Sequence, residues 1–218
     1  MIRQKTSPPA TAQGNKRAAT RKGIGRQQVL EAARTLSNAE GIEGLSVRAL
    51  ADHLGIRPPS VYAHVDGLDE IKRSLALWGH QALAETLRDS AVGLSGPAAL
   101  FEMCTAYLQF VRTEPGLYSA TVPTPQPEDV PLRQAADQWL AVFYKVFAGL
   151  ALDEEAQIHA LRGLRSIVHG FGTLEASGAF RTKYDRDLSF RTVLSTFIKA
   201  VADASPAHAG AQPQDAKP

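Results

Sequence analysis

Apolar residues recur at intervals of three and four along most of this sequence. Val29, Ala33 and Leu36 have this spacing near the beginning, and Phe190 and Leu194 have it near the end. Such intervals place side chains on one face of an α-helix, whereas a half-buried strand needs strict alternation of apolar and polar residues. That alternation is absent from the sequence, which therefore predicts an all-α fold.

Capping residues divide this pattern into separate helices. Ser46, Asp66 and Asp153 are good N-caps, and Gly55 suits the C-terminal end of a short helix. The helices expected from these signals span residues 26–40, 47–54, 59–65, 67–92, 97–113, 132–150, 154–177 and 187–203.

Two segments have a more specific prediction. The helix expected at residues 97–113 is apolar around most of its circumference, which predicts a central, buried position. Five prolines between residues 115 and 131 favour a loop there, with one turn of helix near Tyr118. On the last helix, the residues expected to face inward are Phe190, Val193, Leu194, Phe197 and Val201.

Basic side chains are concentrated at the N-terminal end. Of the 24 basic side chains in the chain, residues 1–26 hold seven and no acidic ones, so 17 basic and 22 acidic side chains remain beyond them. Residues 1–23 lack apolar periodicity and are expected to form a disordered basic arm, and residues 205–218 a disordered tail. The arm either adds phosphate contacts to a polyanion-binding region or is only a solubilising tail.

Several classes of protein are excluded by the same sequence. No apolar run approaches the ~20 residues that span a bilayer, and no apolar segment follows the first basic residues as in a secretory signal. The single cysteine, Cys104, excludes an internal disulfide and fits a reducing cytoplasm. Metal-ligand spacings, phosphate-binding glycine loops and nucleophile elbows are all lacking, so we expect no cofactor, no metal and no catalytic residue.

The three short helices expected in residues 26–65 are typical of a helix-turn-helix, because a tight turn joins the second to the third. In that motif the second of the two paired helices lies in the major groove of DNA. Val61 and Val65 are four residues apart and can both face the core. Ser60, Tyr62 and His64 then point elsewhere, where each can donate a hydrogen bond to a phosphate oxygen.

Two arginines flank this turn. Arg48 lies in the first turn of the second helix and can reach a base edge, and Arg57 can touch a phosphate or a base. Simpler interpretations remain open for single residues: Arg48 as a phosphate contact, Tyr62 as a half-buried aromatic residue and His64 as an ordinary surface residue.

The motifs in this region read GLSVRALA at residues 44–51, LGI at residues 54–56 and PSVYAHV at residues 59–65. With them, residues 26–80 resemble the N-terminal domain of TetR-family transcriptional regulators. Many members of that family carry a lysine near the start of the fourth helix, where this chain has Leu68, and Lys72 one turn later is a candidate substitute. The resemblance implies that Arg48 and Arg57 are candidates for base reading and that backbone contacts come from Ser46, Pro59, Ser60, Tyr62 and His64.

Residues 165–180 are similar to a helix of the C-terminal subfamily that is named for a Trp-His-Gly signature, with Val168 at the tryptophan position. The resemblance implies that the last two long helices pair with those of a second subunit in a four-helix interface. Three glycines in this helix, at 163, 170 and 172, indicate that another helix approaches closely.

The family's ligand pocket provides a precedent for a cavity in the C-terminal region. The bulky apolar and aromatic residues there are also explained as plain core, and His169 as a packing residue. The candidates for ligand binding are Trp78, Met103, Tyr107, Phe110, Tyr118, Trp139, Phe143 and Phe147.

We therefore expect a helix-turn-helix DNA-binding domain at residues 24–84 and a ligand-binding and dimerisation domain at residues 85–204. The leading interpretation is a homodimeric repressor that an apolar or aromatic small molecule releases from a palindromic, double-stranded DNA operator, with two recognition helices about 34 Å apart. The alternatives are a transcriptional activator, an interaction module that has lost DNA binding and an enzyme acting on a small apolar substrate. The enzyme has no base–nucleophile pair to support it, and the module is disfavoured by the joint presence of Arg48, Tyr62 and His64.

Overall fold

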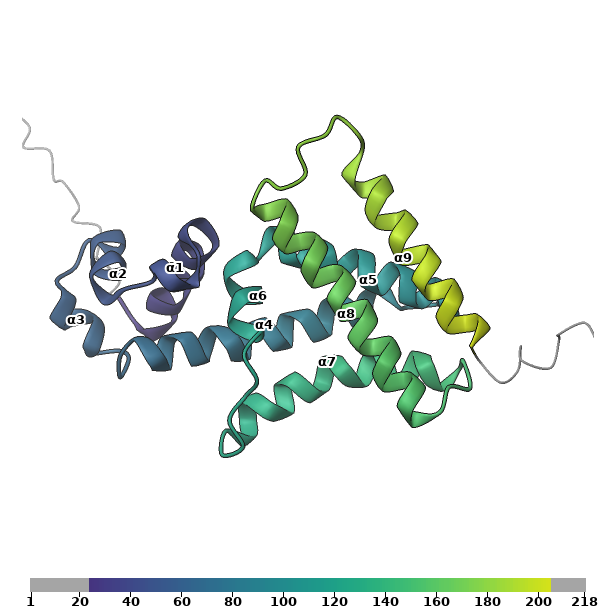
Figure 1. Cartoon of the computed structure of the whole chain (residues 1–218). Coiled ribbons are helices and arrows are strands. Elements are labelled where there is room, and N and C mark those ends of the chain that lie inside the picture. The colour runs from purple at the N-terminus through teal and green to yellow at the C-terminus, as the bar shows by residue number, and fades with distance from the viewer. Residues whose placement is uncertain (1–23, 205–218) are drawn as a thin grey trace, which may run out of the picture.

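The computed structural model describes residues 24–204, which form nine α-helices and one 3-10 helix without any strand (Figure 1). The all-α prediction is confirmed. The predicted arm (1–23) and tail (205–218) lie outside the described residues. The elements are α1 (Arg26–Glu40), η1 (Ile42–Gly44), α2 (Val47–Leu54), α3 (Pro58–Tyr62), α4 (Leu68–Ser90), α5 (Gly96–Thr113), α6 (Pro115–Thr121), α7 (Val130–Ala148), α8 (Glu154–Ala176) and α9 (Arg186–Asp203).

Helices α1, α2 and α3 form a small head at one end of the molecule (Figure 1). The predicted caps of α2 are present: the Ser46 hydroxyl accepts a hydrogen bond from the Ala49 N–H at 3.1 Å, and Gly55 has a left-handed backbone with φ 66°. Val61 and Val65 are buried in the head, as their spacing predicts.

Two helix ends in the head differ from the prediction. Helix α3 begins at Pro58 and ends at Tyr62, three residues before the predicted end. Asp66 does not cap α4, so that prediction was wrong: Gly67, with φ 121°, is the N-cap. The Glu70 carboxylate in the first turn of α4 reaches back and accepts a hydrogen bond from the Asp66 backbone N–H at 2.6 Å, so Asp66 takes part through its backbone and not as a capping side chain.

Helix α4 connects the head to the rest of the molecule. At 23 residues it is about 35 Å long, and it runs without interruption from beneath the head into the C-terminal helices (Figure 1). The domain boundary predicted between residues 84 and 85 falls inside this helix. The two predicted regions therefore share one continuous element, whose buried face includes Ile71 and Leu75 near the head and Leu83 and Leu87 farther on.

Helix α6 is longer than predicted. The proline-rich segment was expected to contain one turn near Tyr118, but α6 occupies seven residues. Pro115 begins the helix, at a position where no backbone N–H is needed for the helical hydrogen bonds and the fixed φ of proline is already suitable. The remaining prolines up to residue 127 lie in the connection to α7.

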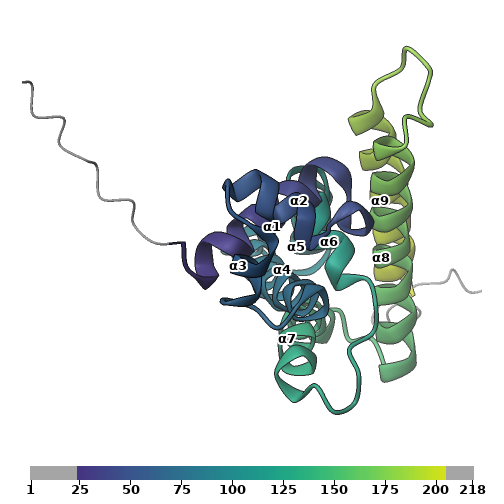
Figure 2. The ribbon, with the colours of Figure 1, turned by 90° about the vertical axis from the view of Figure 1, so that its left-hand side faces the viewer.

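Helix α5 occupies the centre of the C-terminal region, as its apolar circumference predicts, and packs against α4, α6, α7, α8 and α9. Helices α8 and α9 form a layer on one side of this region (Figure 2). Phe190 and Leu194 of α9 face inward, but Val193 is 51% exposed, so its predicted inward position was wrong within the single chain.

The predicted close approaches at the glycines of α8 are found at two of the three. A Cβ on Gly172 would lie 2.7 Å from Val111 Cγ1 of α5, and one on Gly163 would overlap the Phe197 ring of α9, with Cε2 at 2.8 Å. Gly170 has open space beside it among the described residues. None of the helices between residues 24 and 204 has both the length and the apolar character needed to cross a bilayer.

Candidate nucleic-acid interface

The outer surface of the head carries polar and basic side chains that the core does not use. Val61 is the only residue of α3 that is buried, and Ser60 and Tyr62 beside it are exposed, Tyr62 by 57%. His64 follows in the turn after α3 and is half-buried. An exposed tyrosine next to a serine and a histidine offers three donors of the kind that bind phosphate oxygens.

Helix α2 and the turn add two cations to this surface. The Arg48 side chain is 89% exposed, and its Nε lies 3.9 Å from an Asp52 carboxylate oxygen that is itself exposed. Arg57 is the N-cap residue of α3 and is also exposed, together with Pro59. An exposed pair such as Arg48–Asp52 contributes about 0–1 kcal/mol, so Arg48 can exchange Asp52 for another acceptor at little cost.

Lys72 is placed differently from the other predicted contacts. It projects from α4, its side chain is 33% exposed, and its Nζ lies 3.7 Å from a carboxylate oxygen of Glu43 in η1. Leu68, at the position where the resemblance to TetR-family regulators implied a lysine, is half-buried against the apolar core. A phosphate contact by Lys72 requires it to leave Glu43.

The head is attached to α6 by a polar cluster that the sequence did not reveal. The Glu114 carboxylate accepts hydrogen bonds from the Arg34 guanidinium and, at 2.8 Å, from the Asn38 amide, and the Asn38 carbonyl oxygen accepts the Gly116 N–H at 2.8 Å. The Arg34 guanidinium lowers the pKa of Glu114, so the carboxylate is charged near neutral pH. Arg34 also lies over the Trp78 ring, 4.9 Å from its centre.

Glycines let α6 approach both neighbouring helices. A Cβ on Gly116 would lie 2.5 Å from the Ser37 carbonyl carbon of α1, and a Cβ on Gly79 would lie 2.7 Å from the Leu117 carbonyl oxygen. Real Cβ atoms do not come this close to backbone atoms, so any side chain at either position would separate the helices. Helix α6 is therefore in direct contact with α1 of the head and with α4.

The predicted ligand-binding residues other than Trp78 are buried, and several pack against one another. The Tyr107 ring makes edge contacts with the rings of Tyr118 and Trp139, and Trp139 makes one with Phe143. The remaining candidates, Met103, Phe110 and Phe147, are buried in the same core, whereas Trp78 is half-buried under Arg34. Ligand binding by this group stays a prediction.

Two of these residues border cavities. Tyr118 lines a hollow of about 430 Å³ between η1, α6 and α8, where its hydroxyl and Nδ1 of His169 are hydrogen-bonded at 2.6 Å. Trp139 lines a smaller cavity of about 220 Å³ together with His80 and Arg165.

No role for His80 was predicted from the sequence, yet its side chain is only 2% exposed. The Trp139 Nε1–H donates a hydrogen bond to its Nδ1 at 3.2 Å, and Nε2 has no partner among the described residues. Burial, assisted by the charge of Arg165, lowers the pKa of His80 to about 4, so the ring is neutral at pH 7. The available signal was its spacing, since His80 is four residues from the buried Ala76 and Ala84.

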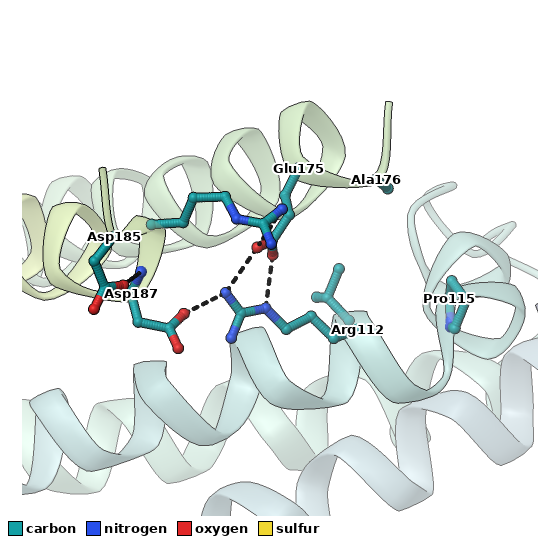
Figure 3. A pocket seen from close by; sticks show the side chains of 9 residues that line it. Arg112, Pro115, Glu175, Ala176, Asp185 and Asp187 are labelled. Atoms are coloured by element: carbon teal, nitrogen blue, oxygen red, sulfur yellow. Dashed lines mark hydrogen bonds and ion pairs between the residues drawn. The ribbon is translucent and has the colours of Figure 1, made fainter. Parts of the chain in front are cut away.

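A third hollow, of about 490 Å³, lies between α5, α8 and the start of α9 (Figure 3). Its charged groups are paired with one another: Arg112 contacts carboxylate oxygens of Glu175 and Asp187, each at 2.6 Å, and Arg186 lies 3.5 Å from Glu175. The cluster joins three helices, and because its charges are paired within the protein, few of them are available to bind a ligand.

Comparison with known proteins identifies the family. The family model described as "Bacterial regulatory proteins, tetR family" matches residues 29–66, and "Tetracyclin repressor-like, C-terminal domain" matches residues 100–197. The chain is 35% identical over 182 residues to the uncharacterized HTH-type transcriptional regulator YobS of Bacillus subtilis (strain 168), covering 81% of this chain and 94% of that protein. The chain belongs to the TetR family.

Other relatives agree with this assignment. The uncharacterized HTH-type transcriptional regulator Rv0681 of Mycobacterium tuberculosis is 31% identical over 71% of this chain and 72% of that protein. Among solved structures, a TetR variant of Acinetobacter baumannii AYE in complex with minocycline has the same fold, with a TM-score of 0.63 and 21% identity over 84% of this chain and 99% of that one. The protein is a TetR-family DNA-binding transcriptional regulator, a family whose members form dimers and usually bind a small molecule.

Proposed function

We propose that this TetR-family protein is a homodimeric repressor that binds a palindromic operator and is released from it by a small molecule. The observation that carries the proposal is the surface of α3, where a single buried valine is flanked by exposed Ser60 and Tyr62. The head, residues 24–84, is the proposed DNA-binding domain, and residues 85–204 are the proposed ligand-binding and dimerisation domain.

Each exposed residue of the head has a proposed role. Arg48 and Arg57 read bases, because a guanidinium can bind the guanine edge with two hydrogen bonds. Lys72 adds a phosphate contact from α4 after leaving Glu43. The residues proposed to hold the DNA backbone are Ser46, Pro59, Ser60, Tyr62 and His64.

Dimerisation is proposed to use the layer formed by α8 and α9. This layer exposes large apolar side chains that a single chain leaves in water: Leu174 of α8 is 49% exposed, and Leu188 and Val193 of α9 are 64% and 51% exposed. Burial of such residues against their equivalents in a second subunit would be favourable by ~25 cal/mol per Å² of apolar surface. The same contact would explain why Val193 faces outward in the single chain.

Release from DNA is proposed to operate through α6. This helix contacts α1 through Glu114 and Gly116 and contacts α4 beside Gly79, so a ligand that displaces α6 changes the position of the head. A coupling of about 1–3 kcal/mol between the two sites would weaken operator binding roughly 5- to 150-fold.

The experiment is a fluorescence-anisotropy titration of the purified protein with duplex DNA from upstream of its own gene. Tyr62→Phe and His64→Ala should weaken binding to all sequences, because phosphate contacts carry no base preference. Arg48→Ala should cost about 1–3 kcal/mol and relax the preference at one position of each half-site. Arg88→Ala, which removes an exposed arginine from the last turn of α4, away from the head and from the α8–α9 layer, is the matched control.

Unchanged affinity and unchanged base preference in Arg48→Ala would refute the base-reading role. The sign of regulation needs a second measurement, with a reporter placed behind the same upstream DNA. Deletion of the gene raises reporter expression if the protein is a repressor and lowers it if the protein is an activator.

A further inference from the structure

His80 carries a hydrogen-bond donor that the described part of the chain leaves unused. Because Nδ1 accepts the indole N–H of Trp139, the hydrogen of the neutral ring is on Nε2. Nε2 is fully covered and has no acceptor among the described residues. Buried donors almost always have a partner, so an acceptor bound at this point would satisfy a group that is otherwise unfavourably buried.

The cavity beside His80 is small and has walls from four parts of the fold. His80 comes from α4, Trp139 and Leu140 come from α7, and Arg165 comes from α8, while the segment 121–125 closes the side next to α6. Its volume of about 220 Å³ is below the ~300–1,000 Å³ of sites for drug-sized ligands. The cavity therefore suits a small molecule with one polar end.

The charges around the cavity favour an anion. Arg165 is exposed at its edge, with its guanidinium 5.4 Å from the centre of the Trp139 ring, and it forms no ion pair within residues 24–204. Arg133 contributes a second cation to the wall and Asp137 a single carboxylate. With neutral His80, the wall has an excess of one positive charge.

We propose that this cavity binds a small monocarboxylic acid as its carboxylate. One oxygen accepts from the Arg165 guanidinium and the other from Nε2–H of His80, and the apolar part of the ligand packs on Trp139 and Leu140. Because Nε2 is covered, the carboxylate reaches it through a side-chain adjustment in the wall. The inference deepens the proposed function, on which it rests, by naming the chemical class of the effector.

The position of the cavity gives such a ligand access to the helices proposed to control the head. Thr121 and Val122, at the C-terminal end of α6, form part of the wall. His80 follows Gly79, where a Cβ would lie 2.7 Å from the Leu117 carbonyl oxygen of α6. A carboxylate bound between His80 and Arg165 therefore contacts α4 and the end of α6 together.

The test is a titration of the full-length protein, labelled with ¹⁵N in its histidines and free of DNA, with benzoate, phenylacetate and hexanoate. NMR spectra that correlate ring protons with ring nitrogens report on Nδ1 and Nε2 of each histidine, and a His80→Gln variant assigns the signals of His80. We expect at least one of the acids to shift the Nε2 signal of His80, and benzylamine, a cation of similar size, to leave it unchanged.

Arg165→Gln should weaken binding of that acid about tenfold or more, because a hydrogen bond to a charged group is removed. Arg165 is exposed, so this variant is expected to fold even if His80→Gln does not. Arg162→Gln on the same helix is the control and should bind like the unmodified protein. The proposal is overturned if none of the three acids shifts the His80 signal at about 10 mM, or if Arg165→Gln binds as tightly as the unmodified protein.

DNA binding is measured separately, so that the two proposals fail separately. If the acid binds as described but operator affinity is the same with and without it, the ligand is not the effector and the regulatory part of the inference is overturned. If the protein binds no DNA from its own locus, the proposed function fails while the carboxylate site stands on the NMR result.

Discussion

Lowering the pH from about 7.5 to about 5 should remove a contribution of one buried side chain, His80, to the stability of this protein. Burial in the folded chain lowers its pKa from the ordinary 6.5 to about 4, so the unfolded chain binds a proton at pH 5 that the folded chain does not. A folded pKa below the unfolded value gives stability that is full above pH 6.5 and is lost as the pH falls. From these two values the loss is about 2 kcal/mol at pH 5 and about 3 kcal/mol below pH 4.

The assay is urea unfolding, followed by circular dichroism, at both pH values and at one fixed protein concentration, because dimerisation would make stability depend on concentration. The unmodified protein is compared with His80→Gln, whose amide oxygen can still accept the Trp139 indole N–H. All other titrating groups act equally on both proteins, so the difference between their pH-dependent losses isolates His80. His53→Gln, on the outside of α2, is the matched control.

His80→Gln should be less stable than the unmodified protein at pH 7.5 but should lose about 2 kcal/mol less on the change to pH 5. His53→Gln should lose as much as the unmodified protein. The reasoning would be refuted if all three proteins lost stability in parallel, because His80 would then be protonated in the folded chain as readily as in the unfolded one.

Three other predictions concern the packing at Gly116, the proposed dimer interface and the basic N-terminal segment. Gly116→Ala should lower the melting temperature measured by calorimetry, because its methyl group would force α1 away from α6 at a cost of about 1–3 kcal/mol. Gly149→Ala, at an exposed glycine with φ −74°, is the control and should leave the melting temperature unchanged. Equal melting temperatures for the two variants would contradict the close packing at Gly116. A double change of Leu188 and Val193 to Asp should give monomers in sedimentation velocity and weaken operator binding, and a dimer that persists would place the interface elsewhere. Deletion of residues 1–23, which include six basic side chains, should weaken the dependence of operator affinity on salt concentration. The slope of log affinity against log salt concentration should fall by about 0.9 for each phosphate that the arm neutralises. An unchanged slope would mean that the arm does not touch the DNA.

The features that the sequence predicted correctly are local ones. A helix cap involves residues within about four positions of one another, so the caps at Ser46, Gly55 and Asp153 could be recognised without knowing the rest of the fold. Local reasoning failed where two local signals competed. Before α4, Asp66 has a capping side chain and Gly67 a freely adopted positive φ, and Gly67 is the N-cap. Between residues 115 and 131 the prolines predicted a loop, but Pro115 also suits the first turn of a helix and begins α6.

The site was predictable to the same extent. The exposed residues of α2 and α3 follow from helical periodicity together with the family motif, because both describe a short stretch of chain. The contact between Arg34 and Glu114 joins residues 80 positions apart, and no spacing within either helix indicates it. Burial of His80 was implied by the periodicity of α4, but its partner Trp139 comes from another helix, so the unused donor on Nε2 became evident only in the folded chain.

Helix α4 also limits how this regulator can be taken apart or recombined. A fragment cut at residue 84 would end in the middle of the helix and would strip Leu83 of the neighbours that cover it, while the other fragment would begin with Leu87 exposed to water. A chimera that joins this head to another effector domain must therefore retain α4 through Ser90. The new effector domain must then pack against the buried face of α4 that this chain supplies.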